Sequence, residues 1–446
     1  MIRLIALLFC LNGFTVCDAF LPISKGSSTP ERALRYKSSW STTRIFSSSA
    51  SLNEQAVELV SGNIPWNSLQ GQADRAFRLG IQLEKNGRSR KASAAFHEAA
   101  TLYQCFLDSK SEFGHVTSLT EDNCPAILAY ACLRLGFLNL DALGDPNAAV
   151  RLYKEASAVD PLPSAVSYDG IGQSLEAARG GRSLLEAVDA YRTALRLKPG
   201  NQKTIFKLAV ALDRLGQKQE AEELMEKLRR AESVYACLVD SWGYVRWHTR
   251  NIPNPQLNLY RGSRDMLEVA LEAARPLIEQ GGLLTEFGVG SGRSIRFTQE
   301  LLPLDVSIHG FDTFTGLPQA WGNEPAGSYS TGGILPNLEG DNVYFHKGLF
   351  KDTIPPFLEE AGDEAFLAYA NVDCDLYSST LDILEAFHGR LVPGTVLVFD
   401  EYICHPSWRQ DEFRAWRECC NRFGWKYEYL AFSLSTKQAV VRILDA

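Results

Sequence analysis

Three acidic residues follow two strand-like runs in the C-terminal half of the chain. Asp373 comes directly after the apolar run 365–372, and Asp400 and Glu401 come directly after the run 395–399. Because open sheets bind ligands at the edge where parallel strands end, these three side chains are expected to lie close together. Carboxylate oxygens are the ligands that Mg²⁺ prefers in proteins. The pattern therefore predicts a Mg²⁺ site with open positions for substrate oxygens, where bound metal would lower the pKa of an acceptor hydroxyl.

Two further residues beside these acids could accept a proton. Asp375 follows the same strand as Asp373, and it serves either as a base or as an anchor for the next helix near Ser379, which is the interpretation we favour. His405 lies three residues past Tyr402 and is a candidate catalytic base, since an imidazole accepts a proton near neutral pH. A solvent-exposed loop histidine explains His405 equally well.

Glycines at alternate positions follow the first strand-like run, 283–289. Bare backbone there would let a cofactor lie against the turn, and the next helix would supply N–H donors. Dinucleotide enzymes need Gly-x-Gly-x-x-Gly, whereas Arg293 stands where that pattern has its last glycine, so the spacing favours S-adenosylmethionine over NAD. The predicted cofactor-binding residues are Glu286, Gly288, Gly290, Gly292, Ser294 and Asp312.

Asp312 ends the second strand-like run. A carboxylate at this place can accept hydrogen bonds from both ribose hydroxyls of a nucleoside cofactor. The alternative is an aspartate that only caps its own turn.

Alternating strand-like and helical runs predict a parallel, doubly wound sheet that positions these residues. The predicted strands are 283–289, 306–311, 342–346, 365–372 and 395–399, and the predicted helices are 293–302, 379–391 and 409–423. Two last runs, 426–432 and 438–444, lie too close together for a helix between them. They therefore predict an antiparallel hairpin at the end of the sheet.

Six short motifs occur in order along this region. They are GFDTFTGLP at 310–318, Trp321, STGG at 330–333, KGLFKDT at 347–353, DCDLYSST at 373–380 and FDEY at 399–402. Together they resemble the macrocin O-methyltransferase family, metal-dependent enzymes that methylate macrolide sugars and related natural products. The resemblance covers about residues 260–445. It implies an α/β Rossmann-like class I methyltransferase domain, assigned here to residues 245–446.

The resemblance also implies roles for the acids. In the family, the acid matching Asp373 is a metal ligand and potential base, and the pair matching Asp400 and Glu401 completes the metal site. The family usually has aspartate where this chain has Glu401, which is one methylene longer. The implied cofactors are S-adenosyl-L-methionine and Mg²⁺, the implied substrate is a small hydroxylated metabolite, and dimers are common in the family.

A repeated spacing of small and large residues marks residues 70–235 as a separate helical domain. Ala92-x3-Phe96-x2-Ala99 recurs from Ala149, from Ala187 and, with Met225 as the large residue, from Ala221. A Leu-Gly-like pair precedes each copy, so that two helices can approach closely with the large residue wedged between them. This resembles the tetratricopeptide repeat and predicts an all-α solenoid. Its surface would either hold a partner protein or pack as a scaffold on the adjacent domain.

Composition excludes several classes of protein. The 446 residues are 45% hydrophobic and 22% charged with a net charge of −8, which indicates a globular chain and argues against sequence-independent nucleic-acid binding. The ten cysteines form no C-x-x-C pairs, so we expect buried thiols in a reducing compartment rather than a zinc or disulfide framework. Beyond the N-terminal segment no apolar run is long enough to span a bilayer, so no membrane contact is expected of the mature chain.

The N-terminus has the composition of a targeting segment. An apolar run from Leu4 to Val16 follows Arg3 and, with cleavage expected after Ala19, resembles a signal peptide. Residues 20–52 are rich in Ser and poor in acids, as transit peptides are. With Phe20 at the junction, the two parts resemble the bipartite plastid presequence of algae with secondary plastids. Ordinary secretion with a Ser-rich stalk is the alternative.

The sequence as a whole predicts a plastid enzyme that methylates a hydroxyl of a sugar-like or phenol-like metabolite. Two other functions stay open. One is a methyltransferase whose acceptor is a protein held by the repeats, and the other is an interaction protein with a catalytically silent fold.

Overall fold

The computed structural model describes residues 69–113, 124–159, 164–178, 182–230, 235–251 and 258–446. The predicted signal and transit segments, 1–19 and 20–52, lie outside these residues. In the described ranges, no helix is both long and apolar enough to cross a bilayer. Five cysteines in these ranges are buried with free thiols: Cys132, Cys374, Cys404, Cys419 and Cys420.

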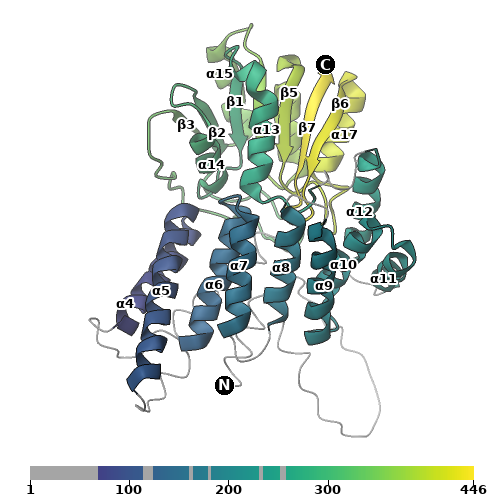
Figure 1. The fold of residues 1–446 in the computed structure, drawn as a ribbon. Helices are drawn as coiled ribbons and strands as arrows, with labels where there is room; N and C mark the ends of the chain where they lie inside the picture. The colour runs from purple at the N-terminus through teal and green to yellow at the C-terminus, as the bar shows by residue number, and fades with distance from the viewer. Residues whose placement is uncertain (1–68, 114–123, 160–163, 179–181, 231–234, 252–257) are drawn as a thin grey trace, which may run out of the picture.

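In the described part of the N-terminal half, the helices α4 to α11 form the helical array, and α5 to α9 stand side by side in Figure 1. Each helix of the array contacts the next one along the chain. The helices are α4 (Leu69–Lys85), α5 (Ser89–Phe113), α6 (Cys124–Asp141), α7 (Pro146–Val159), α8 (Ala165–Ala177), α9 (Arg182–Leu197), α10 (Gln202–Arg214) and α11 (Lys218–Arg230). This arrangement is compatible with a helical solenoid, and the tetratricopeptide assignment stays a prediction.

The repeated small and large residues do pack against each other. A methyl group built on Gly80 would lie 2.8 Å from the ring of Phe96, and one on Gly172 would lie 2.5 Å from the ring of Tyr191. Tyr191 is fully buried, as is Phe96. The small residue of one helix therefore receives the ring of the next, as the spacing predicted.

The C-terminal half is a seven-stranded sheet with helices on both faces, reached through α12 (Ala236–Thr249) and α13 (Ser263–Ile278). Its strands are β1 (Leu283–Phe287), β2 (Ile308–Asp312), β3 (Val343–Lys347), β4 (Leu367–Val372), β5 (Leu391–Phe399), β6 (Lys426–Phe432) and β7 (Ala439–Asp445). The covering helices of this half also include α14 (Arg293–Leu301), α15 (Phe350–Ala361), α16 (Tyr377–Ala386) and α17 (Glu412–Phe423).

The strand order is β3-β2-β1-β4-β5-β7-β6. The first five strands in the chain pair in parallel, whereas β7 pairs antiparallel with both β5 and β6. The predicted parallel sheet with a terminal hairpin is therefore confirmed. The chain reverses between β6 and β7 beside the end of β5, because Ala439 pairs with Phe399.

The carboxyl ends of the parallel strands face the helical array (Figure 1). The loops after β1 and β5 and the β6–β7 turn occupy this edge. Backbone contacts bring the segment before α13 to the same place, since the N–H of Leu434 donates to the carbonyl of Leu259 at 2.8 Å. The edge of the sheet that is expected to bind ligands is thus enclosed between the two halves of the chain.

Candidate active site

The glycine turn, residues 288–292, joins β1 to α14 with backbone that side chains would obstruct. Gly288 has φ of 90°, and a methyl group built there would lie 1.7 Å from the carbonyl oxygen of Asp373. Gly292 has φ of 78° and caps the start of α14 in the left-handed conformation. Glycine is the residue that adopts such angles readily, so the predicted turn of bare backbone at a helix start is present.

The side chains of Glu286 and Ser294 support the glycine turn through hydrogen bonds. Glu286 is fully buried and accepts a hydrogen bond of 2.8 Å from the hydroxyl of Ser294 and one of 3.3 Å from the amide of Asn371. Burial raises the pKa of Glu286 to about 8. Both side chains therefore secure the first turn of α14, which differs from the direct cofactor contact predicted for them.

Asp312 binds the backbone of two loops at once. Its carboxylate accepts the N–H of Gly290 at 2.7 Å and the N–H of Phe314 at 2.6 Å. The turn-capping alternative is therefore realised. Each carboxylate oxygen retains a further lone pair, which leaves room for a ribose hydroxyl.

The predicted acids converge at the ends of β4 and β5. Asp373 and Asp400 lie close enough for the charge of Asp400 to act on Asp373, and Asp375 acts electrostatically on Asp373 as well. Burial, followed by the charges of Asp400 and Asp375, raises the pKa of Asp373 well above its ordinary value. Burial also raises the pKa of Asp400. Neighbouring acids with raised pKa values mark this edge of the sheet as a candidate functional site.

Glu401 is paired with a cation of the protein itself. The ammonium of Lys437, in the β6–β7 turn, lies 2.7 Å from Glu401, and both side chains are buried. The neighbouring Gln438 donates to Asp400 at 2.7 Å. Among the residues that the structure describes, no set of three or more acidic, histidine or cysteine side chains is arranged to hold a metal. Glu401 therefore does not group with Asp373 and Asp400 in this structure, and ligation of Mg²⁺ by these three acids stays a prediction.

His405 is not the exposed loop residue of the alternative prediction. It is 2% exposed, and its Nε2 lies 2.7 Å from the carbonyl oxygen of Glu401, so that nitrogen carries the proton. Burial, with the nearby charge of Lys437, lowers the pKa of His405 to about 3. An imidazole with so low a pKa is a weak base at neutral pH, so this geometry argues against the catalytic role predicted for His405.

Asp375 does not anchor the following helix through a side-chain cap. The N-cap of α16 is Leu376, and it makes no side-chain capping bond. Asp375 itself has φ of 61°, a strained conformation for a residue with a side chain, and is half-buried. The alternative role of Asp375, as a base, stays a prediction.

Three contributors to this edge were missed by sequence reasoning. Glu412, at the start of α17, is fully buried and lies 3.4 Å from the N–H of Cys374. Lys437 and Gln438 come from the hairpin turn, and the predicted hairpin was a usable signal, because its turn had to fall beside the end of β5. Nothing in the local sequence marks Glu412 in this way.

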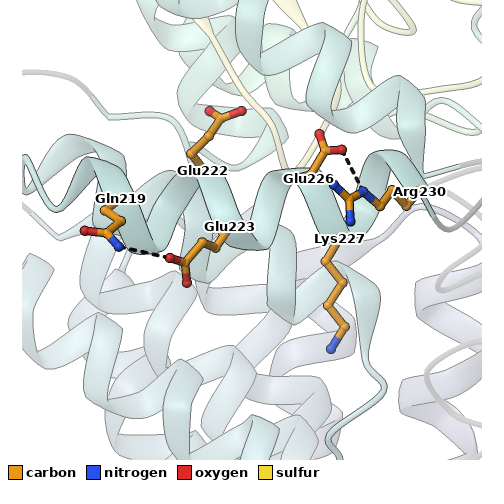
Figure 2. A pocket seen from close by; sticks show the side chains of 6 residues that line it. All are labelled: Gln219, Glu222, Glu223, Glu226, Lys227 and Arg230. Atoms are coloured by element: carbon orange, nitrogen blue, oxygen red, sulfur yellow. Dashed lines mark hydrogen bonds and ion pairs between the residues drawn. The ribbon is translucent and has the colours of Figure 1, made fainter.

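A surface hollow on α11 lies apart from this edge (Figure 2). Its side chains come from one helix and bond along it, with Gln219 donating to Glu223 at 3.2 Å and Arg230 donating to Glu226 at 2.8 Å (Figure 2). Neighbouring side chains on one helix commonly make such exposed pairs. The hollow therefore carries no arrangement for chemistry comparable to that at the sheet edge.

Comparison with known proteins bears on the C-terminal half. The family model described as Macrocin-O-methyltransferase (TylF) matches residues 336–422, which include the acids after β4 and β5. Mycinamicin III 3''-O-methyltransferase of Micromonospora griseorubida is 31% identical over 117 residues, which are 26% of this chain and 42% of that protein.

A second curated relative is similar to the same degree. The 8-demethyl-8-(2,3-dimethoxy-alpha-L-rhamnosyl)-tetracenomycin-C 4'-O-methyltransferase of Streptomyces olivaceus is 31% identical over 147 residues, 27% of this chain and 53% of that protein. The chain thus spans about half the length of these relatives. The solved structure of CalS11, a calicheamicin methyltransferase, is 22% identical and covers 50% of this chain and 92% of its own, with a TM-score of 0.33.

The family match falls on the half of the chain that holds the sheet and its acids. Family and relatives alike are O-methyltransferases by name, and the name of the second relative includes a rhamnosyl group. The C-terminal region of this chain is therefore similar to the macrocin O-methyltransferases, a similarity that supports an enzyme of the O-methyltransferase class.

Proposed function

We propose that the chain is an S-adenosylmethionine-dependent O-methyltransferase that acts on a hydroxyl of a small, sugar-like or phenol-like metabolite. One observation carries the proposal. The glycine turn touches the backbone of Asp373, since a methyl group on Gly288 would lie 1.7 Å from that carbonyl oxygen. A cofactor held by the turn would therefore lie beside the acid cluster, where an acceptor hydroxyl can lose its proton.

The reaction needs positioning and one proton acceptor. When bound, S-adenosylmethionine supplies a sulfonium methyl group, which the acceptor oxygen attacks in line as the carbon–sulfur bond breaks. The glycine turn and Asp312 would orient the nucleoside end of the cofactor. Asp373 and Asp375, which both follow β4, are the candidate bases.

Cofactor binding is tested first. Calorimetric titration of S-adenosylmethionine into the full chain should show saturable binding, and Asp312→Ala should weaken it roughly 10- to 100-fold, the value of a hydrogen bond to a charged group. Asp305→Ala, an exposed acid before the same strand, is the matched control and should bind like the unaltered chain. A folded chain that binds no S-adenosylmethionine would contradict the proposal.

Methyl transfer is tested next, with labelled S-adenosylmethionine and a panel of hydroxylated sugars and phenols. Asp375→Asn should lower kcat by roughly 100-fold or more if Asp375 is the base, with cofactor affinity unchanged. A chelator belongs in the same assay. Activity that survives it shows transfer without a divalent cation, and activity that Mg²⁺ restores shows a metal site completed by groups other than Glu401.

The same assay separates the two other functions. Cofactor binding with transfer only to proteins would indicate a protein-directed methyltransferase, and a chain without binding or transfer would indicate a silent fold. Deletion of residues 53–235 is a poor substitute, because the helical array encloses the edge of the sheet that carries the acids.

For location in the cell we propose the plastid, on the composition of residues 1–52. The full chain with a fluorescent C-terminal tag should enter plastids of an alga with secondary plastids. Removal of residues 20–52 should divert it to the secretory route, because the signal peptide remains. Secretion of the unaltered chain would contradict the proposal.

A further inference from the structure

The helical array contacts the glycine turn directly, and we propose that Asp141, at the end of α6, is a positioning residue for that turn. It would act through Arg293, the first residue of α14. This inference rests on the proposed function, because the turn is taken as the cofactor site. It assigns the array a part in cofactor binding in addition to packing.

Asp141 joins three segments of the chain. It is 5% exposed, and its carboxylate forms an ion pair with the guanidinium of Arg293. Its other oxygen accepts from the N–H and the hydroxyl of Ser263, at 3.1 Å and 3.0 Å. A methyl group on Gly262 would lie 2.5 Å from the Cα of Asp141, so α13 begins in close contact with α6. The carboxylate is therefore held rigidly where it meets Arg293.

The turn between α4 and α5 is a second part of the helical array that contacts the start of α14. A methyl group on Gly87 would lie 3.1 Å from the Cα of Arg293, which places backbone of the array against the start of α14. Arg296, one turn along, donates to the carbonyl of Gly87 at 2.9 Å and to the carbonyl of Gly292 at 2.8 Å. One guanidinium thus bonds the array to the last residue of the glycine turn.

Charges of both halves surround Arg293. Glu84 of α4 on the array and Asp400 and Asp373 at the sheet edge act on its charge. Attraction from acids on both sides would pull the side chain in either direction. Asp141 is the acid that forms an ion pair with Arg293, and it would thereby hold the first turn of α14 and its N–H groups in one orientation.

The test compares two ion pairs that join α14 to the array. Asp141→Asn keeps an oxygen for Ser263 but removes the charge toward Arg293. Glu300 lies near the far end of α14 and pairs with Arg90 of α5 at 3.2 Å and with Arg264 of α13 at 2.7 Å, and Glu300→Gln removes its charge. Titration of S-adenosylmethionine into each full chain should show roughly tenfold weaker binding for Asp141→Asn and less than twofold change for Glu300→Gln.

Coupling is checked with Arg293. Arg293→Gln should weaken binding about as much as Asp141→Asn, the double variant should be no weaker than either single one, and Arg293→Lys should recover part of the loss. Additive losses would show that Asp141 does not act through Arg293. Equal affinity of Asp141→Asn and the unaltered chain would overturn the inference and leave the proposed function standing, whereas no binding by the unaltered chain would overturn the function.

A second variant covers failure to fold. If melting shows that Asp141→Asn is unfolded, Arg296→Gln removes the bonds to Gly87 and Gly292 from a half-exposed side chain. It should weaken S-adenosylmethionine binding several-fold with the melting temperature nearly unchanged. Unchanged affinity in this folded variant would count against control of the turn by the array.

Discussion

Glycine serves opposite purposes in the two halves of the molecule. In the helical array Gly80 and Gly172 lie inside regular helices, and each leaves space that an aromatic ring fills. In the C-terminal half, Gly288 and Gly292 have positive φ, and they allow the backbone to follow a turn that other residues would adopt with strain. The first kind is a packing residue that tolerates no added volume, and the second is a conformational residue that tolerates no side chain at that angle.

Buried charge differs between the halves as well. The array pairs its buried charges, as in Glu176 with Arg214 at 2.6 Å. The sheet edge instead holds several neighbouring acids that act on each other electrostatically, and Lys437 pairs with Glu401. Paired charges serve stability and specificity, whereas crowded like charges mark a site that is built for a ligand or a proton.

The largest effect is expected where backbone and volume both forbid a side chain. Gly288→Ala should lose roughly 3 kcal/mol or more of local stability, through the strain at φ of 90° and the clash with Asp373, and should abolish S-adenosylmethionine binding. Gly281→Ala is the control, since it also has positive φ but an open surrounding. Cofactor titration and thermal melting are the measurements. Normal binding by Gly288→Ala would show that the turn is more plastic than its geometry indicates.

A smaller effect is expected for the packing glycines. Gly172→Ala should cost about 1–3 kcal/mol of stability, because the ring of Tyr191 has nowhere to move. Gly243→Ala in α12 meets nothing within 4 Å and should stabilise the chain by up to about 1 kcal/mol. Urea unfolding of both variants gives the comparison. Stabilisation of both would remove the distinction between the two kinds of glycine.

The smallest effect concerns pH and the sheet. His309 and His346 lie 3.1 Å apart through their ring nitrogens, and burial lowers the pKa of His309 from 6.5 to about 4. Below pH 6.5, His309 binds a proton in the unfolded chain but not in the folded chain. The contribution of neutral His309 to folding stability is therefore fully present above pH 6.5 and is lost as the pH falls toward 4. His309→Phe should therefore flatten the fall of melting temperature between pH 6.5 and 4.

The control for this series is His97→Gln, an exposed histidine on α5, which should leave the profile unchanged. An unaltered profile in His309→Phe would assign the acid sensitivity to other groups. The array would then be no more tolerant of acid than the sheet.

Local pattern was enough to predict much of the fold. The strand over 426–432 has the predicted bounds, and the hairpin follows because the next run begins too soon for a helix. Apolar periodicity records such features over a few residues. Helix α15 was missed, and it contains Pro355 and Pro356, which speak against a helix interior when the sequence is read alone.

Contacts between distant segments could not be predicted. His405 looked like a loop residue, yet its loop is covered by α12, where the hydroxyl of Ser241 accepts the N–H of Cys404 at 2.8 Å. The ion pairs of Glu401 with Lys437 and of Arg293 with Asp141 also join segments far apart in the chain. Neither periodicity nor a motif indicates which side chain pairs with a given acid. The sequence therefore predicted the acids of the site but not their ion-pair partners.

The α4–α5 turn packs against the start of α14, so the stability of the helical array and ligand binding at the glycine turn are thermodynamically coupled. A coupling free energy between two sites is the same in both directions. If the array strengthens ligand binding at the glycine turn, bound ligand therefore stabilises the array against unfolding to the same extent. Above Kd, this stabilisation grows with the logarithm of the ligand concentration. Occupancy at the sheet edge would thus be readable around Gly87 and Asp141 as slower exchange of amide hydrogens with solvent.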